Sequence, residues 1–316
     1  MTRPSFGGLA RLAVAAGLTA LVLWKSDPRA VLDAAAGARP GPILVAVGLV
    51  LVDRALMAYR WLVLLRPLPE AARPPFFAVM RVFFVSTFVG TFLPASVGGD
   101  AVRAYALSKL KVPAADSVAS VLMDRILGVL SLLLMALVGL LIVRTLAANP
   151  VIRLSLVVTT IVCAAAALLV FSDAADRVAR RVIAACPWPR LQRVGHALLE
   201  SIQRYATHHG ALANVLTGSV GVQVLRVVQA WCLGRALGID ATLSLYFAFI
   251  PLILIVMLLP VTINGIGTSQ AAFVWFFGQA GVGRPEAFAL SVLFVALGIV
   301  GNLPGAALYL WKGTGR

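Results

Sequence analysis

The sequence predicts an all-α fold, a polytopic bundle of membrane helices that forms one integral membrane domain over residues 1–316. Hydrophobic residues make up 61% of the chain and charged residues only 12%, whereas soluble domains hold roughly 45–50% and 25%. The mean hydropathy is +0.97. Apolar segments of about 20 residues, the length that a helix needs to cross a hydrocarbon core, recur along the whole chain. Segments that alternate between apolar and polar residues, which are typical of membrane barrels, are missing.

Long apolar segments are expected to form helices, and two shorter helices are expected to follow breaks at proline and glycine. The long segments cover residues 8–24, 42–65, 76–94, 114–143, 151–171, 211–236, 243–260 and 286–311, and the shorter ones cover 100–110 and 268–280. The first segment resembles a signal peptide, but the polar spacer that follows it, residues 25–33, indicates a first helix that is not cleaved.

Residues 173–210 form the one long polar stretch and are expected to be a cytoplasmic amphipathic linker. Apolar residues such as Val178, Val182, Leu191 and Val194 recur there near helical spacing among arginines. This pattern predicts amphipathic helix that lies on the membrane surface.

The distribution of basic residues favours six membrane spans and two re-entrant hairpins. If all the long segments crossed the membrane, arginine and lysine would divide almost evenly between the two sides. If residues 76–110 and 243–280 instead each enter and return on one side, most basic residues gather on the side of both termini. The positive-inside rule then places the termini and the polar linker in the cytoplasm.

The two proposed hairpin tips have similar sequences. Residues 93–99 read Leu-Pro-Ala-Ser-Val-Gly-Gly, and residues 259–265 read Leu-Pro-Val-Thr-Ile-Asn-Gly. The helices before them also correspond, because Arg54 and Arg226 are each followed at equal spacing by an alanine and an aromatic residue. An inverted repeat of helix, hairpin and helix is expected, an arrangement typical of transporters. The alternative is kinked helices that cross fully. The repeats would be residues 42–143 and 211–312.

Proline and glycine at both tips interrupt a helix at membrane depth, where irregular backbone survives only in protein or beside a wet cavity. A helix that begins at Gly98 and Gly99 would direct free N–H groups towards that cavity, and such groups bind phosphate. The alternative is a simple kink that lets two helices pack closely.

Ionisable residues inside the apolar segments are candidates for function, because they are costly in a membrane. Adjacent residues on a helix point about 100° apart, so Asp53 and Arg54 are not expected to neutralise each other fully. Partners on neighbouring helices are expected. Arginine outnumbers aspartate in the set, which indicates an anionic ligand such as the phosphate of a lipid headgroup. The alternative is an ion-pair network that only holds the bundle together. The set is Asp53, Arg54, Arg81, Asp100, Arg103, Asp124, Arg125 and Arg226.

Several other functions are disfavoured. The net charge of +15, from 27 basic and 12 acidic residues, would suggest nucleic acid in a soluble protein, but here it fits anionic lipid headgroups. No hydrolase, zinc-protease, nucleotide or C-x-x-C motif is present, so we expect no catalytic residue, no metal and no cofactor. Two alternatives to transport stay open: a membrane enzyme that uses Asp100 or Asp124 on a lipid phosphate, and a non-transporting scaffold for a partner enzyme. Homo-oligomerisation also stays open.

Four motifs together resemble the family of lysylphosphatidylglycerol synthase transmembrane regions, which are flippase-like membrane proteins. They are G-G-D-A-V-R-A-Y at 98–105, D-R-I-L-G at 124–128, A-L-G-I-D at 236–240 and L-P-V-T-I-N-G-I-G-T-S-Q-A-A at 259–272. The resemblance implies a bacterial inner-membrane protein that moves lipids between leaflets. It also implies that aminoacylation is absent, since no aminoacyl-transferase domain follows before Arg316.

The resemblance implies a set of site residues at both tips and in the middle of one span. They are Asp100, Arg103, Tyr105, Asp124, Arg125, Asn264, Gly265 and Gly267. Family members often carry an acid where this sequence has Gln270. This difference favours a neutral or anionic cargo, including hopanoid-type lipids, over a cationic one.

Overall fold

The computed structural model describes most of the chain, and this part consists of helices and their connections, as the predicted all-α class requires. It covers residues 20–21, 23–24, 27–70, 73–91, 93, 98–142, 150, 153–154, 157–158, 160–161, 164, 173–206, 208–258 and 266–311. The helices are α2 (Pro28–Ala36), α3 (Pro40–Leu64), α4 (Phe76–Thr91), α5 (Gly98–Ser108), α6 (Ala114–Ile142), α8 (Asp173–Ala184), α9 (Pro189–Ala206), α10 (His209–Ala236), α11 (Leu243–Leu258), α12 (Thr268–Gly278) and α13 (Arg284–Trp311).

Four helices in the described part of the chain are long and apolar enough to cross a membrane: α3, α6, α10 and α13. They have 25 to 29 residues, and about 20 suffice for a hydrocarbon core. Each was predicted as a span. The other two predicted spans, residues 8–24 and 151–171, lie largely outside the described residues.

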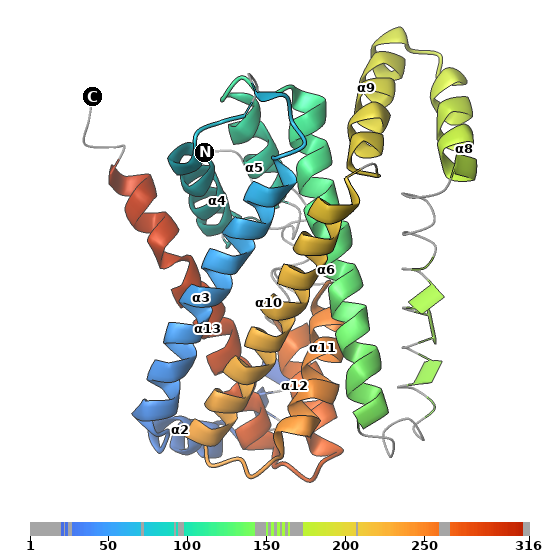
Figure 1. The fold of residues 1–316 in the computed structure, drawn as a ribbon. Helices are drawn as coiled ribbons and strands as arrows, with labels where there is room; N and C mark the ends of the chain where they lie inside the picture. Colours follow the sequence, from blue (N-terminus) through green and yellow to red (C-terminus); the bar gives the residue numbers. More distant parts are fainter. Residues whose placement is uncertain are drawn as a thin grey trace.

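Two pairs of shorter helices connect the long ones. Helices α4 and α11 have 16 residues each, and α5 and α12 have 11 each. These lengths correspond to about 24 and 16 Å, which is short of the roughly 30 Å of a hydrocarbon core. Figure 1 places α4 and α5 at the end of the bundle where α3 ends and α6 begins, and α11 and α12 at the opposite end, where α10 ends and α13 begins.

Packing partners match between the two halves. Helices α3 and α10 run antiparallel and make the most extensive contact in the bundle. Helix α4 packs against α13, and its counterpart α11 packs against α6. Likewise α5 packs against α6, and α12 packs against α13. Each short pair is therefore held by the last long helix of both halves.

Glycine lets the cross-half contacts become close. A Cβ atom on Gly139 of α6 would lie 2.3 Å from the carbonyl oxygen of Phe247 in α11. A Cβ atom on Gly305 of α13 would lie 2.1 Å from the carbonyl oxygen of Phe84 in α4. Small residues at helix interfaces allow backbones to approach in this way. These glycines therefore fix how near each short pair sits to the long helix of the other half.

The polar spacer near the N-terminus leads into a short helix, α2, which the sequence reasoning did not predict. The Asp27 carboxylate accepts a hydrogen bond from the Arg29 backbone N–H at 3.1 Å, and Pro28 occupies the first turn. Both are signals of a helix start. Val31 on α2 packs against Phe288 and Ala289 of α13.

The predicted amphipathic linker is helical in its described part but divides into α8 and α9, an antiparallel pair that extends past the N-terminal end of α6 (Figure 1). The break falls at residues 185–188 and contains Pro187, which disfavours continuation of α8. Pro189 begins α9, a position where proline is favoured. One face of α9, with Ile202 and Tyr205, packs beside Met123 of α6. Part of the apolar periodicity in the linker thus serves contact with the bundle.

Substituting Gly139 or Gly305 by alanine is expected to destabilise the protein by about 1–3 kcal/mol, the usual cost of overpacking. Gly48→Ala is the matched control, because a Cβ atom on Gly48 meets no atom within 4 Å, and alanine favours helix over glycine. Thermal unfolding of the purified variants in detergent measures the difference. Unchanged melting temperatures for both close-contact variants would show that these backbone approaches do not constrain the bundle.

Candidate functional site

A cavity of about 540 Å³ lies inside the bundle, between the two pairs of short helices. Seven helices line it: α3, α4, α5, α6, α10, α11 and α13. One part of the lining is charged or polar. The other part is apolar and comes mainly from α6, α11 and α13. Its residues on these three helices are Val129, Leu132, Leu254, Met257, Leu258, Phe294, Val295 and Ile299, and Val50, Val222 and Ile266 add to them. The cavity can therefore accommodate both a polar group and hydrocarbon.

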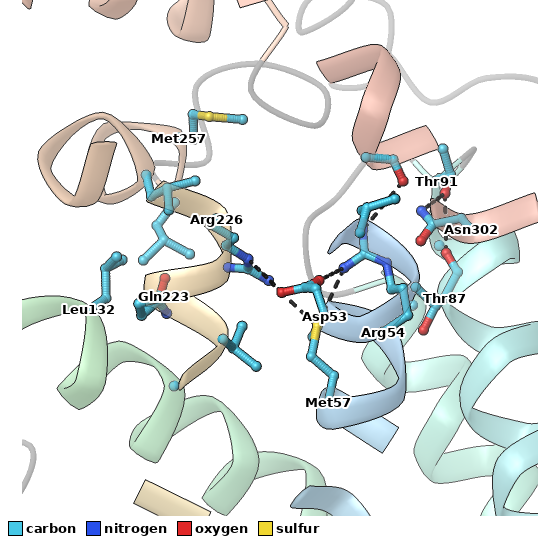
Figure 2. Close-up of a pocket in the computed structure, with 18 of the residues that line it drawn as sticks. Asp53, Arg54, Met57, Thr87, Thr91, Leu132, Gln223, Arg226, Met257 and Asn302 are labelled. Atoms are coloured by element: carbon cyan, nitrogen blue, oxygen red, sulfur yellow. Dashed lines mark hydrogen bonds and ion pairs between the residues drawn. The ribbon is translucent and has the colours of Figure 1, made fainter. Parts of the chain in front are cut away.

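The first charge cluster is centred on Asp53, which is 1% exposed. Figure 2 shows its carboxylate between Arg54, on the same helix, and Arg226 of α10. Arg54 Nη1 lies 3.0 Å from Asp53 Oδ2, and Arg226 Nε lies 3.5 Å from Asp53 Oδ1. The sulfur of Met57 lies 3.4 Å from Arg54 Nη1 and 3.5 Å from Arg226 Nη2. This cluster ties together α3 and α10.

Asp53 and Arg54 form an ion pair with each other, although the sequence reasoning favoured partners on neighbouring helices. The long arginine side chain brings its guanidinium back to the neighbouring carboxylate although the two Cβ atoms point in different directions. A partner from a neighbouring helix, Arg226, is also present, as expected. One carboxylate is thus shared by two guanidinium groups.

The second cluster joins α3, α5 and α6. Asp124 Oδ1 lies 2.7 Å from Arg60 Nη2, and Asp124 Oδ2 lies 3.2 Å from Arg103 Nη1. Arg103 also lies 3.9 Å from Asp100, one turn earlier on α5, and Asp100 forms an ion pair with Arg125 of α6. The five residues alternate in charge along the chain of contacts. Because α5 contributes two of them, the cluster fixes this short helix to its neighbours.

Aromatic rings support Arg103 from the other side. Its guanidinium carbon lies 5.3 Å from the ring centre of Trp61 and 4.9 Å from that of Phe83. Cations are attracted to aromatic faces at these distances. Arg103 is 6% exposed, so its position is set by two carboxylates and two rings.

Arginine exceeds aspartate in the cavity lining by two: five arginines stand against three aspartates. The Nε–H groups of Arg54, Arg60 and Arg103 are buried and find no acceptor among the described residues. Buried donors without partners are costly, and guanidinium groups suit carboxylate and phosphate oxygens. The chemistry of the lining therefore favours an anion.

Neutral polar groups extend the polar wall beside Arg54. Arg54 Nη2 lies 3.3 Å from the carbonyl oxygen of Gly298 in α13, and Asn302 donates to Thr91 Oγ1 at 2.8 Å. Thr87 lies one turn before Thr91 on α4 and also lines the cavity (Figure 2). A ligand held by Arg54 would meet hydroxyl and amide groups as well.

The structure brings together about half of the residues that the sequence singles out. Those that line the cavity are Asp53, Arg54, Gly99, Asp100, Arg103, Asp124, Arg125 and Arg226. Those that are described and do not line it are Arg81, Gly98, Tyr105, Gly267 and Gln270. Asn264 and Gly265 lie outside the described residues, as do Pro94 and Pro260.

The described residues outside the cavity contact other parts of the bundle or are exposed. Arg81 Nη2 lies 3.5 Å from the carbonyl oxygen of Leu308 in α13, and Tyr105 is 65% exposed. A Cβ atom on Gly98 would lie 2.7 Å from the Leu93 side chain. Gln270 accepts hydrogen bonds from the Gly267 N–H and, at 2.9 Å, from the Ser269 hydroxyl, which closes the first turn of α12.

Gly99 agrees with both interpretations of the first glycine pair, a helix start beside the cavity and a close contact between two helices. It opens α5 and lines the cavity, and a Cβ atom on it would lie 3.1 Å from the Cα atom of Gly90 in α4. The predicted helix start at Gly98 is thus present, and close packing of α4 on α5 also requires small residues there.

Arg60 is the important residue that the sequence reasoning missed, because it was counted among the charges at the end of a span. Arg60 is 3% exposed, and it makes the shorter of the two ion-pair contacts to Asp124. Its spacing could have identified it. Residues 53, 57 and 60 follow one another at helical intervals of four and three, so they share a face.

Asp124→Asn is expected to destabilise the protein by roughly 3–5 kcal/mol, because it leaves Arg60 and Arg103 charged and buried without their carboxylate. Thermal unfolding in detergent measures the loss. Adding Arg60→Met to Asp124→Asn should recover part of it, since one uncompensated charge is then removed.

Asp240→Asn is the matched control, since Asp240 is exposed and its pair with Arg235 is a surface contact. It should leave the melting temperature nearly unchanged. Equal melting temperatures for Asp124→Asn and Asp240→Asn would contradict the structural importance of the second cluster.

Comparisons with known proteins give one match. No curated protein and no solved structure matches the chain. The family described as the lysylphosphatidylglycerol synthase TM region matches residues 8–305, which include α3, α6, α10, most of α13, both short pairs and both charge clusters. The match agrees with the resemblance read from the motifs. On this coverage, the chain belongs to the lysylphosphatidylglycerol synthase TM region family.

Proposed function

We propose that this protein is a flippase-like lipid transporter that moves a lipid headgroup between the two leaflets through the central cavity. The observation that carries the proposal is the surplus of arginine in a cavity lined by all four helices that are long and apolar enough to cross a membrane. Charge at membrane depth is costly and is kept where it faces a pathway or a ligand. The family, a membrane region tied by its description to a lipid synthase, fits a lipid as the ligand.

The proposed topology has six spans and two re-entrant pairs, α4–α5 and α11–α12, in an inverted repeat. Three observations support it. The helix lengths of the two halves run 25, 16, 11 and 29 against 28, 16, 11 and 28 residues. The packing partners correspond, and the two short pairs lie at opposite ends of the bundle (Figure 1). Inverted repeats with broken helices at the midplane are a transporter architecture.

A lateral path for the acyl chains would lie between the two short pairs. Helices α6 and α13 hold the pairs apart, and no extensive packing joins α4 or α5 to α11 or α12 in the described residues. Met257, Leu258 and Ile266 line the cavity near this gap. We propose that the tails remain in the bilayer there while the headgroup passes the arginines.

The proposed location is the bacterial inner membrane, with both termini in the cytoplasm. Helices α8 and α9, which contain most of the basic residues of the linker, lie at the same end of the bundle as α4 and α5 (Figure 1). The positive-inside rule favours the cytoplasm for that end.

Transport is preferred over catalysis because each carboxylate of the cavity is already engaged. Asp124 is held by Arg60 and Arg103, and Asp100 contacts Arg103 and Arg125. A carboxylate whose oxygens are held in ion pairs must break one of these contacts before it can act as a base or a nucleophile. The alternative of an enzyme that uses Asp100 or Asp124 predicts product formation by purified protein, which the proposal does not.

Reconstitution in vesicles tests the proposal. With fluorescent lipids and a membrane-impermeant quencher, vesicles that contain the protein should lose fluorescence from both leaflets, whereas empty vesicles lose only the outer-leaflet signal. Arg54→Gln together with Arg226→Gln should slow the loss of the inner-leaflet signal by roughly tenfold or more, since charge-assisted contacts to the headgroup disappear.

Arg81→Gln is the matched control, because Arg81 lies on α4 but not in the cavity. It should retain transport. Identical quenching of empty and protein-containing vesicles, for phosphate-bearing and neutral lipids alike, would refute the proposed function.

A further inference from the structure

The surplus of positive charge divides equally between the two clusters. In the first, Arg54 and Arg226 share Asp53, which leaves one positive charge. In the second, Arg60, Arg103 and Arg125 share Asp100 and Asp124, which also leaves one. Both clusters line the same cavity. A ligand in this cavity therefore faces two separate sites, each short of one negative charge.

No other acid of the chain supplies these charges. Asp53, Asp100 and Asp124 are the acidic residues of the described lining. Asp116, the acid nearest in sequence to Asp124, pairs with Arg204 at 3.1 Å, away from the cavity. The segments outside the described residues contain no aspartate or glutamate. The missing negative charge must come from outside the protein.

Uncompensated charge is costly at membrane depth, so the most stable ligand is one that neutralises both clusters. A phosphodiester carries a single negative charge and can neutralise only one of the two clusters. A phosphomonoester carries about 1.5 to 2 negative charges near neutral pH, and a diphosphate carries at least as many. The guanidinium groups most accessible in the cavity, those of Arg125 and Arg226, have side chains 45% and 25% exposed and belong to different clusters.

We infer that the cavity selects lipids whose headgroup ends in a phosphomonoester or a diphosphate, with a doubly charged phosphate group between the two clusters, over lipids with a phosphodiester headgroup. This inference rests on the proposed function in taking the ligand to be a lipid. The apolar part of the lining, from Leu254 and Met257 to Phe294, then contacts the first part of the hydrocarbon chain.

Equilibrium binding to the full-length protein in detergent tests the charge preference. The probes are phosphatidic acid, a phosphomonoester, and phosphatidylglycerol, a phosphodiester with the same acyl chains. The pH is held about two units above the second phosphate pKa of about 6. Phosphatidic acid is expected to bind roughly tenfold more tightly, because it adds one attractive charge in a partly buried site. Equal affinities would overturn the inference.

Charge variants test whether the two clusters set the preference. Arg226→Gln lowers the surplus from two to one and should bring the two affinities to within about threefold of each other. Arg81→Gln, outside the cavity, should keep the full preference. Arg125→Gln, at a side chain that is 45% exposed, also lowers the surplus from two to one and provides a second variant if Arg226→Gln does not fold. A preference that survives in either of these variants, or is lost in Arg81→Gln, would overturn the inference.

Inorganic diphosphate distinguishes a lipid from a free anion. It should displace phosphatidic acid only at concentrations at least roughly tenfold higher, since it lacks the hydrocarbon that the apolar lining buries. Displacement at equal concentration would overturn the assignment of a lipid. Because binding is measured without transport, a protein that shows the preference but moves no lipid would refute the proposed function alone, and transport without the preference would refute only this inference.

Discussion

Buried carboxylates that are each shared by two guanidinium groups hold the helices of the bundle together. Asp124 lies between Arg60 and Arg103, and Asp53 lies between Arg54 and Arg226. An isolated charge at this depth would be prohibitively costly, but a charge held by partners on other helices joins those helices. The same contacts that fasten α3 to α6 and α10 leave a positive surplus directed at one cavity. Stability and ligand chemistry thus come from one network.

The matching halves explain how a cavity persists in an apolar protein. Each of the four short helices is shorter than the hydrocarbon core is thick. Each pair of them packs on α6 and α13, the last long helices of the two halves. Gly139 and Gly305 allow α6 to approach α11 and α13 to approach α4 closely. The space between the pairs remains because α6 and α13 hold them from either side. The charges, however, are unevenly distributed: α5 carries Asp100 and Arg103, whereas α11 and α12 carry no charged residue.

Much of the fold could be predicted from hydropathy, because bilayer thickness fixes how long an apolar helix must be. The spans α3, α6, α10 and α13 follow directly from it, and proline and glycine mark where α5 and α12 begin. Side-chain partners were harder to predict, because a flexible arginine can reach several neighbours. Arg60 looked like an end-of-span charge, and Arg81 looked like a cavity residue, yet only Arg60 faces the cavity. The helix α2 was missed although Asp27 and Pro28 give ordinary start signals.

An experimental structure of the protein in a lipid nanodisc, with phosphatidic acid among the lipids, would show whether the cavity receives a lipid headgroup. We expect density for a phosphate within ion-pair distance of Arg226 and Arg125, and density for acyl chains that leave between α4–α5 and α11–α12. A cavity closed by side chains, with the guanidinium groups turned towards the aqueous faces and lipid density only on the outer surface, would contradict this expectation.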